Sequence, residues 1–146
     1  MSKPTQVEAL ISAAVETYGR LDCACNNAGI EGKVVPLAEQ GEENFDRVLS
    51  INAKGTFLCL KYEIGQMIKQ GGGAIVNLSS VAGLIGFPGL GPYVASNHAI
   101  NGLTKNAALV YSKFGIRVNS ICPGGIEMRM LDYNAQVVIN RVALTG

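Results

Sequence analysis

Short apolar runs alternate with segments of helical periodicity along this sequence, and this alternation constrains the fold more than any other feature. Apolar runs at residues 21–25, 74–78 and 116–122 are typical of buried β-strands. Apolar side chains at i, i+3, i+4 and i+7 predict helices before, between and after these runs, over 5–18, 45–70 with a break near Gly55, 93–114 and 134–144. Strands that alternate with helices form a parallel sheet with right-handed crossovers. We therefore predict an α/β fold with helices on both faces of a parallel sheet.

The composition limits the class of protein. A length of 146 residues allows one domain. Hydrophobic residues make up 48% of the chain and charged residues 16%, which excludes a disordered chain. A formal net charge of +1 gives no electrostatic case for a nucleic-acid partner. No apolar run is long enough to predict a membrane span, so we expect no membrane partner.

The cysteines do not form the dense pattern of a disulfide scaffold. Cys23 and Cys25 lie two positions apart in the first apolar run, and Cys59 and Cys122 lie far from them. In a strand, Cys23 and Cys25 would share one face, but no other cysteine or histidine lies nearby in sequence to complete a metal site. We therefore expect buried free thiols, no metal and a cytoplasmic location.

Polar and turn-forming residues follow each predicted strand. Asn26 and Asn27 follow the first, Ser79 and Ser80 the second, and the Pro123-Gly124 pair the third. In open parallel sheets, ligands bind in the crevice beyond the carboxyl ends of the strands. We expect these residues to converge on such a crevice.

Five motifs in the same order resemble the short-chain dehydrogenase/reductase family. They are Asn26-Asn27-Ala28-Gly29, Ile51-Asn52-Ala53-Lys54-Gly55-Thr56-Phe57, Ile75-Val76-Asn77-Leu78-Ser79-Ser80, Tyr93-Val94-Ala95-Ser96, and Arg117-Val118-Asn119 with Pro123-Gly124. The resemblance covers residues 5–130 and implies hydride transfer between NAD or NADP and a small-molecule alcohol or carbonyl. It also implies a partial Rossmann-like, doubly wound parallel sheet.

The resemblance assigns roles to particular residues. Tyr93 would donate the proton, Ser80 would hold the substrate oxygen, Asn52 would kink its helix and hold water, and Asn97 stands at the position of the family's lysine. These four form the predicted catalytic group. The residues expected to contact the cofactor are Asn26, Ala28, Gly29, Tyr93, Asn97, Pro123, Gly124 and Ile126.

Each role has a structural alternative. Tyr93 could be a half-buried packing residue, and Ser80 could cap the loop after its strand. Asn52 continues an apolar helical stripe, so its amide faces inward and needs hydrogen bonds whether or not it acts in catalysis. The glycines of segment 83–91 fit no phosphate-loop pattern, and we interpret them as the floor of a substrate pocket rather than as an anion site.

The chain departs from the family pattern at three points. The family's first βαβαβ half, with the glycines that cradle the pyrophosphate, has no counterpart in residues 1–146, which we take as one partial domain. Asn97 replaces the lysine whose charge would stabilise a tyrosine phenolate, and Met128 replaces the usual threonine. We therefore expect impaired catalysis and weak cofactor binding by this chain alone.

The missing half has a consequence for association. In the family, the strand at 21–26 pairs with the first strand, so here its outer edge would be open to another chain. We expect a homo-oligomer that uses helices 57–69 and 93–114. The remaining alternatives are a non-catalytic oligomerisation or binding module and a fragment without function.

Overall fold

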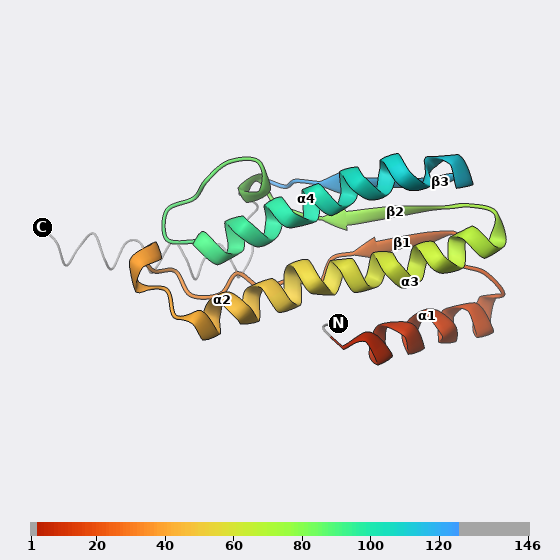
Figure 1. Ribbon diagram of the computed structural model, residues 1–146, viewed down its shortest axis with the longest axis horizontal. Coiled ribbons are helices and arrows are strands. Elements are labelled where there is room, and N and C mark those ends of the chain that lie inside the picture. Colours follow the sequence, from red (N-terminus) through yellow and green to blue (C-terminus); the bar gives the residue numbers. More distant parts are fainter. Residues whose placement is uncertain (1–2, 126–146) are drawn as a thin grey trace, which may run out of the picture.

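The computed structural model describes residues 3–125, which contain one parallel sheet of three strands in the order β1-β2-β3 (Figure 1). The strands are β1 (Cys23–Asn26), β2 (Gly73–Leu78) and β3 (Ile116–Ile121). In register, Ala24 lies opposite Ile75, and Ile75 lies opposite Val118. The predicted parallel α/β fold is confirmed.

The helices follow the predicted order. They are α1 (Pro4–Tyr18), α2 (Glu42–Leu49), α3 (Gly55–Gln70) and α4 (Gly91–Tyr111). A π-helical turn, η2 (Ser50–Lys54), joins α2 to α3 without interruption. Three short 3-10 turns complete the described elements: η1 (Leu37–Glu39), η3 (Val81–Gly83) and η4 (Ser112–Phe114). The expected helix at 134–144 lies outside the described residues.

Both crossover helices cover the same face of the sheet. Helices α3 and α4 contact each other and the strands, and α1 packs against α3 (Figure 1). Two right-handed crossovers that step in the same direction place both helices on one side. The helices expected on the second face are therefore not among those in residues 3–125.

The main core lies between this face and its helices. Buried side chains from α3, β2, α4 and β3 form it: Leu60, Ile64, Met67, Ile75, Ala107, Ile116 and Val118. Val110 of α4 and Phe114 of η4 are 45% and 40% exposed. Because α4 lies over β3, an edge strand of the described sheet, its outer side has no neighbouring element to cover it.

The expectation of buried cysteines is only partly correct, because two of them lie on the uncovered face of the sheet. Cys23 and Cys25 do share one face of β1, but both are exposed, whereas Cys59 is buried and Cys122 is half-buried. Side chains alternate between the faces of a strand, and the described helices cover only one of those faces. The prediction of a buried thiol was therefore right for Cys59 and wrong for Cys23 and Cys25.

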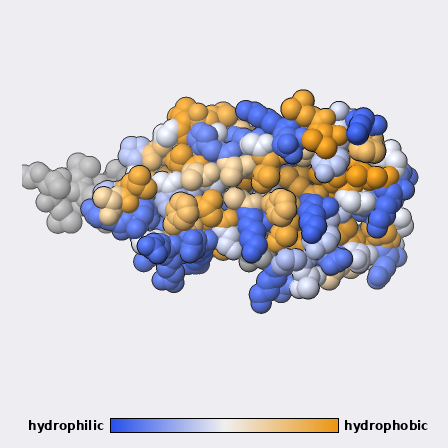
Figure 2. Space-filling model, in the orientation of Figure 1, coloured by the Kyte–Doolittle hydropathy of each residue, from blue (hydrophilic) through white to orange (hydrophobic). Residues whose placement is uncertain are grey.

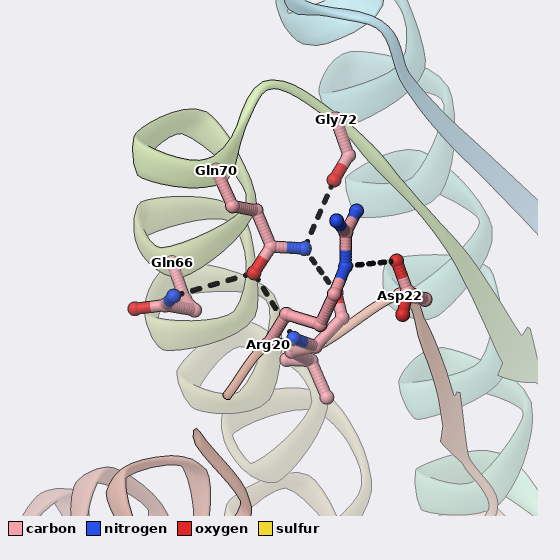
Figure 3. A network of polar contacts seen from close by, with 6 residues as sticks. Arg20, Asp22, Gln66, Gln70 and Gly72 are labelled. Atoms are coloured by element: carbon pink, nitrogen blue, oxygen red, sulfur yellow. Dashed lines mark hydrogen bonds and ion pairs between the residues drawn. The ribbon is translucent and has the colours of Figure 1, made fainter. Parts of the chain in front are cut away.

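A glutamine joins the end of α3 to the entry of β1 (Figure 3). The Gln70 Oε1 atom accepts a hydrogen bond from the Leu21 N–H (3.0 Å), and Gln70 Nε2 donates to the Leu21 carbonyl (2.7 Å) and the Gly72 carbonyl (3.2 Å). Gly71 follows at φ +90°, a left-handed conformation that glycine adopts without strain. This junction sets where β1 and β2 begin.

No helix within residues 3–125 has the length and apolar content needed to cross a bilayer.

Candidate functional site

The loops after β2 and β3 meet, as the sequence predicted. The Ser79 N–H donates to the Ile121 carbonyl (2.9 Å), and the Val81 N–H donates to the Pro123 carbonyl (2.8 Å). These bonds continue the pairing of the two strands beyond their carboxyl ends. Ser80 therefore lies beside the segment that contains Pro123.

Asn52 lies inside the π-helical turn and is 2% exposed. Its Oδ1 accepts from the Ile30 N–H and its Nδ2 donates to the Ile30 carbonyl, each at 2.8 Å. The inward-facing amide predicted from the helical stripe is confirmed. These two bonds hold the loop after β1 against the turn, and π-helical turns occur frequently at functional sites.

A buried serine connects Asn52 to Tyr93. Asn52 Nδ2 also donates to Ser96 Oγ (3.0 Å), and Ser96 Oγ donates to the Tyr93 carbonyl (2.8 Å). The Asn97 Nδ2 atom donates to the same carbonyl (2.9 Å). The structure thus brings Asn52, Tyr93 and Asn97 together, and Ser96 is a residue to which the sequence analysis gave no role.

Tyr93 is held by its backbone rather than by its phenol. The side chain is half-buried, and no described residue hydrogen-bonds to its phenolic oxygen. As far as residues 3–125 are concerned, its hydroxyl can therefore bond to a ligand. Asn97, by contrast, is 3% exposed, and its amide nitrogen points back to its own helix.

Ser80 has the capping role that was its structural alternative. Its Oγ accepts a hydrogen bond from the Ala82 N–H (3.1 Å) at the start of η3. The neighbouring Ser79 Oγ donates to the Asn97 carbonyl (3.2 Å), which ties the end of β2 to α4. A Cβ atom at Gly83 would come within 2.6 Å of Ser79 Oγ, so this close approach requires glycine.

A buried polar network crosses the sheet below these loops. Asn26 Nδ2 donates to both Glu63 Oε2 (3.0 Å) and Asn77 Oδ1 (3.0 Å). Asn77 Nδ2 donates to Thr104 Oγ1 (2.9 Å), and this hydroxyl donates to the Ile100 carbonyl (2.8 Å). The Asn26 side chain is thus engaged inside the molecule, and its cofactor contact stays a prediction.

Burial raises the pKa of two titratable groups in this region, Glu63 and Cys59. Burial raises the pKa of the Glu63 carboxyl, and the hydrogen bond from Asn26 opposes this in part. Burial, together with the nearby Glu63, raises the pKa of the Cys59 thiol to about 11. Cys59 is therefore a poor nucleophile. Residues 3–125 contain no group of three or more His, Cys, Asp or Glu side chains able to hold a metal ion.

Some of the residues expected to contact a nicotinamide cofactor are accessible, whereas Asn26 and Asn97 are buried. Ala28, Gly29 and Gly124 are exposed at the strand ends, and Pro123 is half-exposed. Small residues there let a nucleotide approach the backbone closely. Ile126 and Met128 lie outside the described residues.

Comparison with known proteins connects this geometry to a family. Residues 1–137 match the family model described as short chain dehydrogenase. An uncharacterized oxidoreductase of Thermotoga maritima is 51% identical over 120 residues, which are 80% of this chain and 46% of that protein. Levodione reductase of Leifsonia aquatica is 43% identical over 132 residues, 90% of this chain and 49% of that protein.

Solved structures give the same result. The crystal structure of levodione reductase has a TM-score of 0.91 at 42% identity and covers 94% of this chain and 53% of that chain. NAD+-bound xylitol dehydrogenase has a TM-score of 0.86 at 38% identity, with 93% of this chain and 52% of that chain covered. The chain spans about half the length of the curated relatives it matches. Family model, relatives and structures agree: the chain belongs to the short-chain dehydrogenase family.

Proposed function

We propose that the protein is an NAD- or NADP-dependent oxidoreductase that interconverts a small-molecule alcohol and a carbonyl. The observation that supports this most directly is Tyr93, whose backbone is anchored through Ser96 to Asn52 while its phenol remains unbonded by the described residues. Structures of relatives with NADP bound and with NAD+ bound support the choice of cofactor.

Each residue of the candidate site has a defined task in this proposal. A bound nicotinamide would supply or accept the hydride, and Ala28, Gly29, Pro123 and Gly124 would border it. Tyr93 transfers a proton to or from the substrate oxygen, as general acid or base. Ser80 is half-buried beside η3, and its hydroxyl can still donate a hydrogen bond to that oxygen while it accepts from the Ala82 N–H.

The substrate in this proposal is a ring-bearing secondary alcohol or its ketone. Relatives 40–46% identical are named 2,5-dichloro-2,5-cyclohexadiene-1,4-diol dehydrogenase, cyclohexanol dehydrogenase and 3beta-hydroxysteroid dehydrogenase. In this chain, Leu84, Ile85 and Phe87 are 60%, 53% and 40% exposed in the loop that follows Ser80. Exposed apolar side chains beside a polar site favour a substrate with an apolar body.

A non-catalytic oligomerisation or binding module is the second candidate. The observation that favours it is Asn97, which brings no positive charge to Tyr93 and whose amide is buried. A third possibility combines the two: an oxidoreductase whose catalysis is impaired because Asn97 replaces the lysine. In either case we propose a homo-oligomer and a cytoplasmic location, where the exposed thiols of Cys23 and Cys25 would stay reduced.

Tyr93→Phe tests the oxidoreductase proposal. The assay follows NADH or NADPH formation with cyclohexanol, in a chimera that places the N-terminal half of levodione reductase before this chain. We expect Tyr93→Phe to lower kcat by about 100-fold or more, because it removes the proton-transfer group. Tyr62→Phe, in the contact between α1 and α3, is the matched control and should keep full activity. Equal activity of the Tyr93→Phe and unmodified chimeras would refute the assignment, and an inactive unmodified chimera would favour the non-catalytic module.

A further inference from the structure

Ser96 is completely buried, and its one hydroxyl makes two hydrogen bonds in different directions. Its relative exposure is 0%. The hydroxyl accepts from Asn52 Nδ2 at 3.0 Å and donates to the Tyr93 carbonyl at 2.8 Å. The hydroxyl has one proton to donate, and it has one donor and one acceptor as neighbours. These two partners therefore fix its orientation.

The Asn52 end of this connection is itself immobilised. Both polar atoms of the Asn52 amide bond to the backbone of Ile30, so the amide cannot rotate without breaking two bonds of 2.8 Å. Within residues 3–125, the Asn52–Ser96 bond is the one side-chain hydrogen bond between η2 and α4. This bond therefore adds a directional link between α4 and the π-helical turn to the packing contacts of the two elements.

The Tyr93 carbonyl has a second side-chain donor, Asn97 Nδ2, at 2.9 Å. This bond lies within α4 and leaves the position of the helix relative to η2 undefined. Within residues 3–125, Ser96 is thus the residue whose side-chain hydrogen bonds connect Tyr93 to Asn52 and, through it, to the loop after β1.

We propose that Ser96 is a positioning residue that holds the first turn of α4 against η2 and thereby fixes where the Tyr93 phenol points. Its effect on proton transfer rests on the proposed oxidoreductase function, whereas its effect on the first turn of α4 does not. Loss of the hydroxyl leaves one N–H of Asn52 buried without a partner and releases the contact between the two elements.

Thr104 provides a matched control on the same helix. It is also buried, accepts a hydrogen bond from an asparagine amide (Asn77 Nδ2) and donates to a helical carbonyl (Ile100). Thr104 connects α4 to β2 instead of η2, and it lies eleven residues after Tyr93. Thr104→Val therefore removes an equivalent hydroxyl away from the proposed position.

Amide hydrogen exchange of the 146-residue chain tests the proposal without any need for activity. In Ser96→Ala, we expect the amides of residues 94–97 to exchange about tenfold faster or more, a change that corresponds to about 1.4 kcal/mol of local stability. Thr104→Val should leave these amides at their original rates. Unchanged exchange at 94–97 in Ser96→Ala would overturn the proposal.

Ser96→Thr keeps the hydroxyl and supplies the second variant. It should retain the original exchange rates at 94–97, even if Ser96→Ala does not fold. Loss of protection in a folded Ser96→Thr chain would also contradict the proposal, because the donor and acceptor are still present.

The pH–rate profile of the chimera measures the effect on chemistry. Ser96→Ala should lower kcat by about tenfold and move the apparent pKa of kcat, while Thr104→Val should change neither. If the unmodified chimera is inactive, the proposed function fails, but the exchange experiment still decides the role of Ser96. An active Ser96→Ala chimera with an unchanged profile would overturn the link to Tyr93.

Discussion

At the scale of single residues, Asn97 stands where the resemblance to the family implies a lysine. An ordinary tyrosine has a pKa of about 10, so a neighbouring ammonium is the usual means of making phenolate available at neutral pH. Asn97 has no charge, and its amide nitrogen bonds to the Tyr93 carbonyl instead of extending toward a ligand. Asn97 therefore differs from a lysine in charge as well as in reach.

Asn97→Lys should raise the dehydrogenase rate of the chimera by about tenfold or more near neutral pH. A change of one pKa unit in a phenol changes its phenolate fraction about tenfold, which is worth 1.36 kcal/mol. Asn97→Gln, longer but uncharged, is the control and should give no gain. The pH–rate profile is the measurement, and Tyr93→Phe in the lysine variant should abolish most of the gain. Identical pH–rate profiles for the asparagine and lysine chains would show that Asn97 does not limit the dehydrogenase rate.

Glu63 makes the stability of the fold depend on pH. Burial raises its pKa in the folded chain, so folding favours the protonated carboxyl. The stabilisation is complete below the unfolded value of about 4.3 and is lost as the pH rises toward the raised folded pKa. Above that raised pKa the folded chain must accommodate a buried carboxylate, and within residues 3–125 no cation pairs with it.

Glu63→Gln should remove this pH dependence. The glutamine oxygen can still accept the hydrogen bond from Asn26, so the network remains. We expect the free energy of unfolding of Glu63→Gln, relative to the unmodified chain, to increase as the pH rises above about 4.3, by about 1.36 kcal/mol for each unit of raised pKa. Urea titrations between pH 4 and 8 measure it, with the exposed Glu16→Gln as control. A constant difference across this range would contradict the assignment.

Roles that depend on local sequence spacing could be predicted, whereas roles that depend on a partner far away in the sequence could not. Asn52 was placed inward from the spacing of its own helix, and Ser80 was recognised as a possible cap from its place after a strand. Glu63, Ser96 and Gln70 act through partners 37, 44 and 49 residues away. No local pattern reports such pairings.

At the scale of elements, the apolar runs and helical stripes predicted the strands and helices in their correct order. The break expected near Gly55 was wrong, because α2, η2 and α3 form one continuous helical segment with Gly55 at φ −58°. A glycine permits a break but does not require one, and a π-helical turn that contains Asn52 precedes Gly55 instead. The exposed face of β1 was also unpredictable, since one strand cannot show which of its faces a helix covers.

The junction of α3, β1 and β2 depends on Gln70, and this can be tested. Gln70→Ala leaves the N–H and carbonyl of Leu21 without their partner, and unpartnered buried polar groups cost about 1–3 kcal/mol each. Because the site is only part-buried, we expect a loss of about 1–3 kcal/mol in total, measured by urea unfolding. Gln66→Ala is the control: Gln66 only donates to Gln70 Oε1 at 3.3 Å, so its loss should cost under about 0.5 kcal/mol. Equal effects of the two variants would show that Gln70 does not support the junction.

At the scale of the whole molecule, two surfaces of the described residues are left uncovered: the outer edge of β1 and an apolar surface on α3 and α4. Within residues 3–125, β1 pairs with β2 alone, so its other edge is open. Apolar side chains are spread over the side of the molecule on which α3 and α4 lie (Figure 2). The exposed apolar side chains of these two helices are Phe57 and Ile68 of α3 and Leu109 and Val110 of α4, with Leu109 81% exposed. Open strand edges and exposed apolar patches both favour association.

The two surfaces give two routes to self-association, and single substitutions distinguish them. We expect light scattering at several concentrations to show dimers or larger species. Leu109→Glu should shift the species toward monomer if the helices 57–69 and 93–114 form the interface, because it places a charge where apolar contact is needed. Substitution of so exposed a residue changes folding stability by only about 0.5 kcal/mol, so the shift would report association. Leu10→Glu, at a 54% exposed leucine of α1, is the matched control and should leave the species unchanged. Association that persists in Leu109→Glu but is lost in Cys25→Lys, a charge on the exposed face of β1, would assign the contact to the sheet instead. A folded monomer at every concentration would rule out both routes.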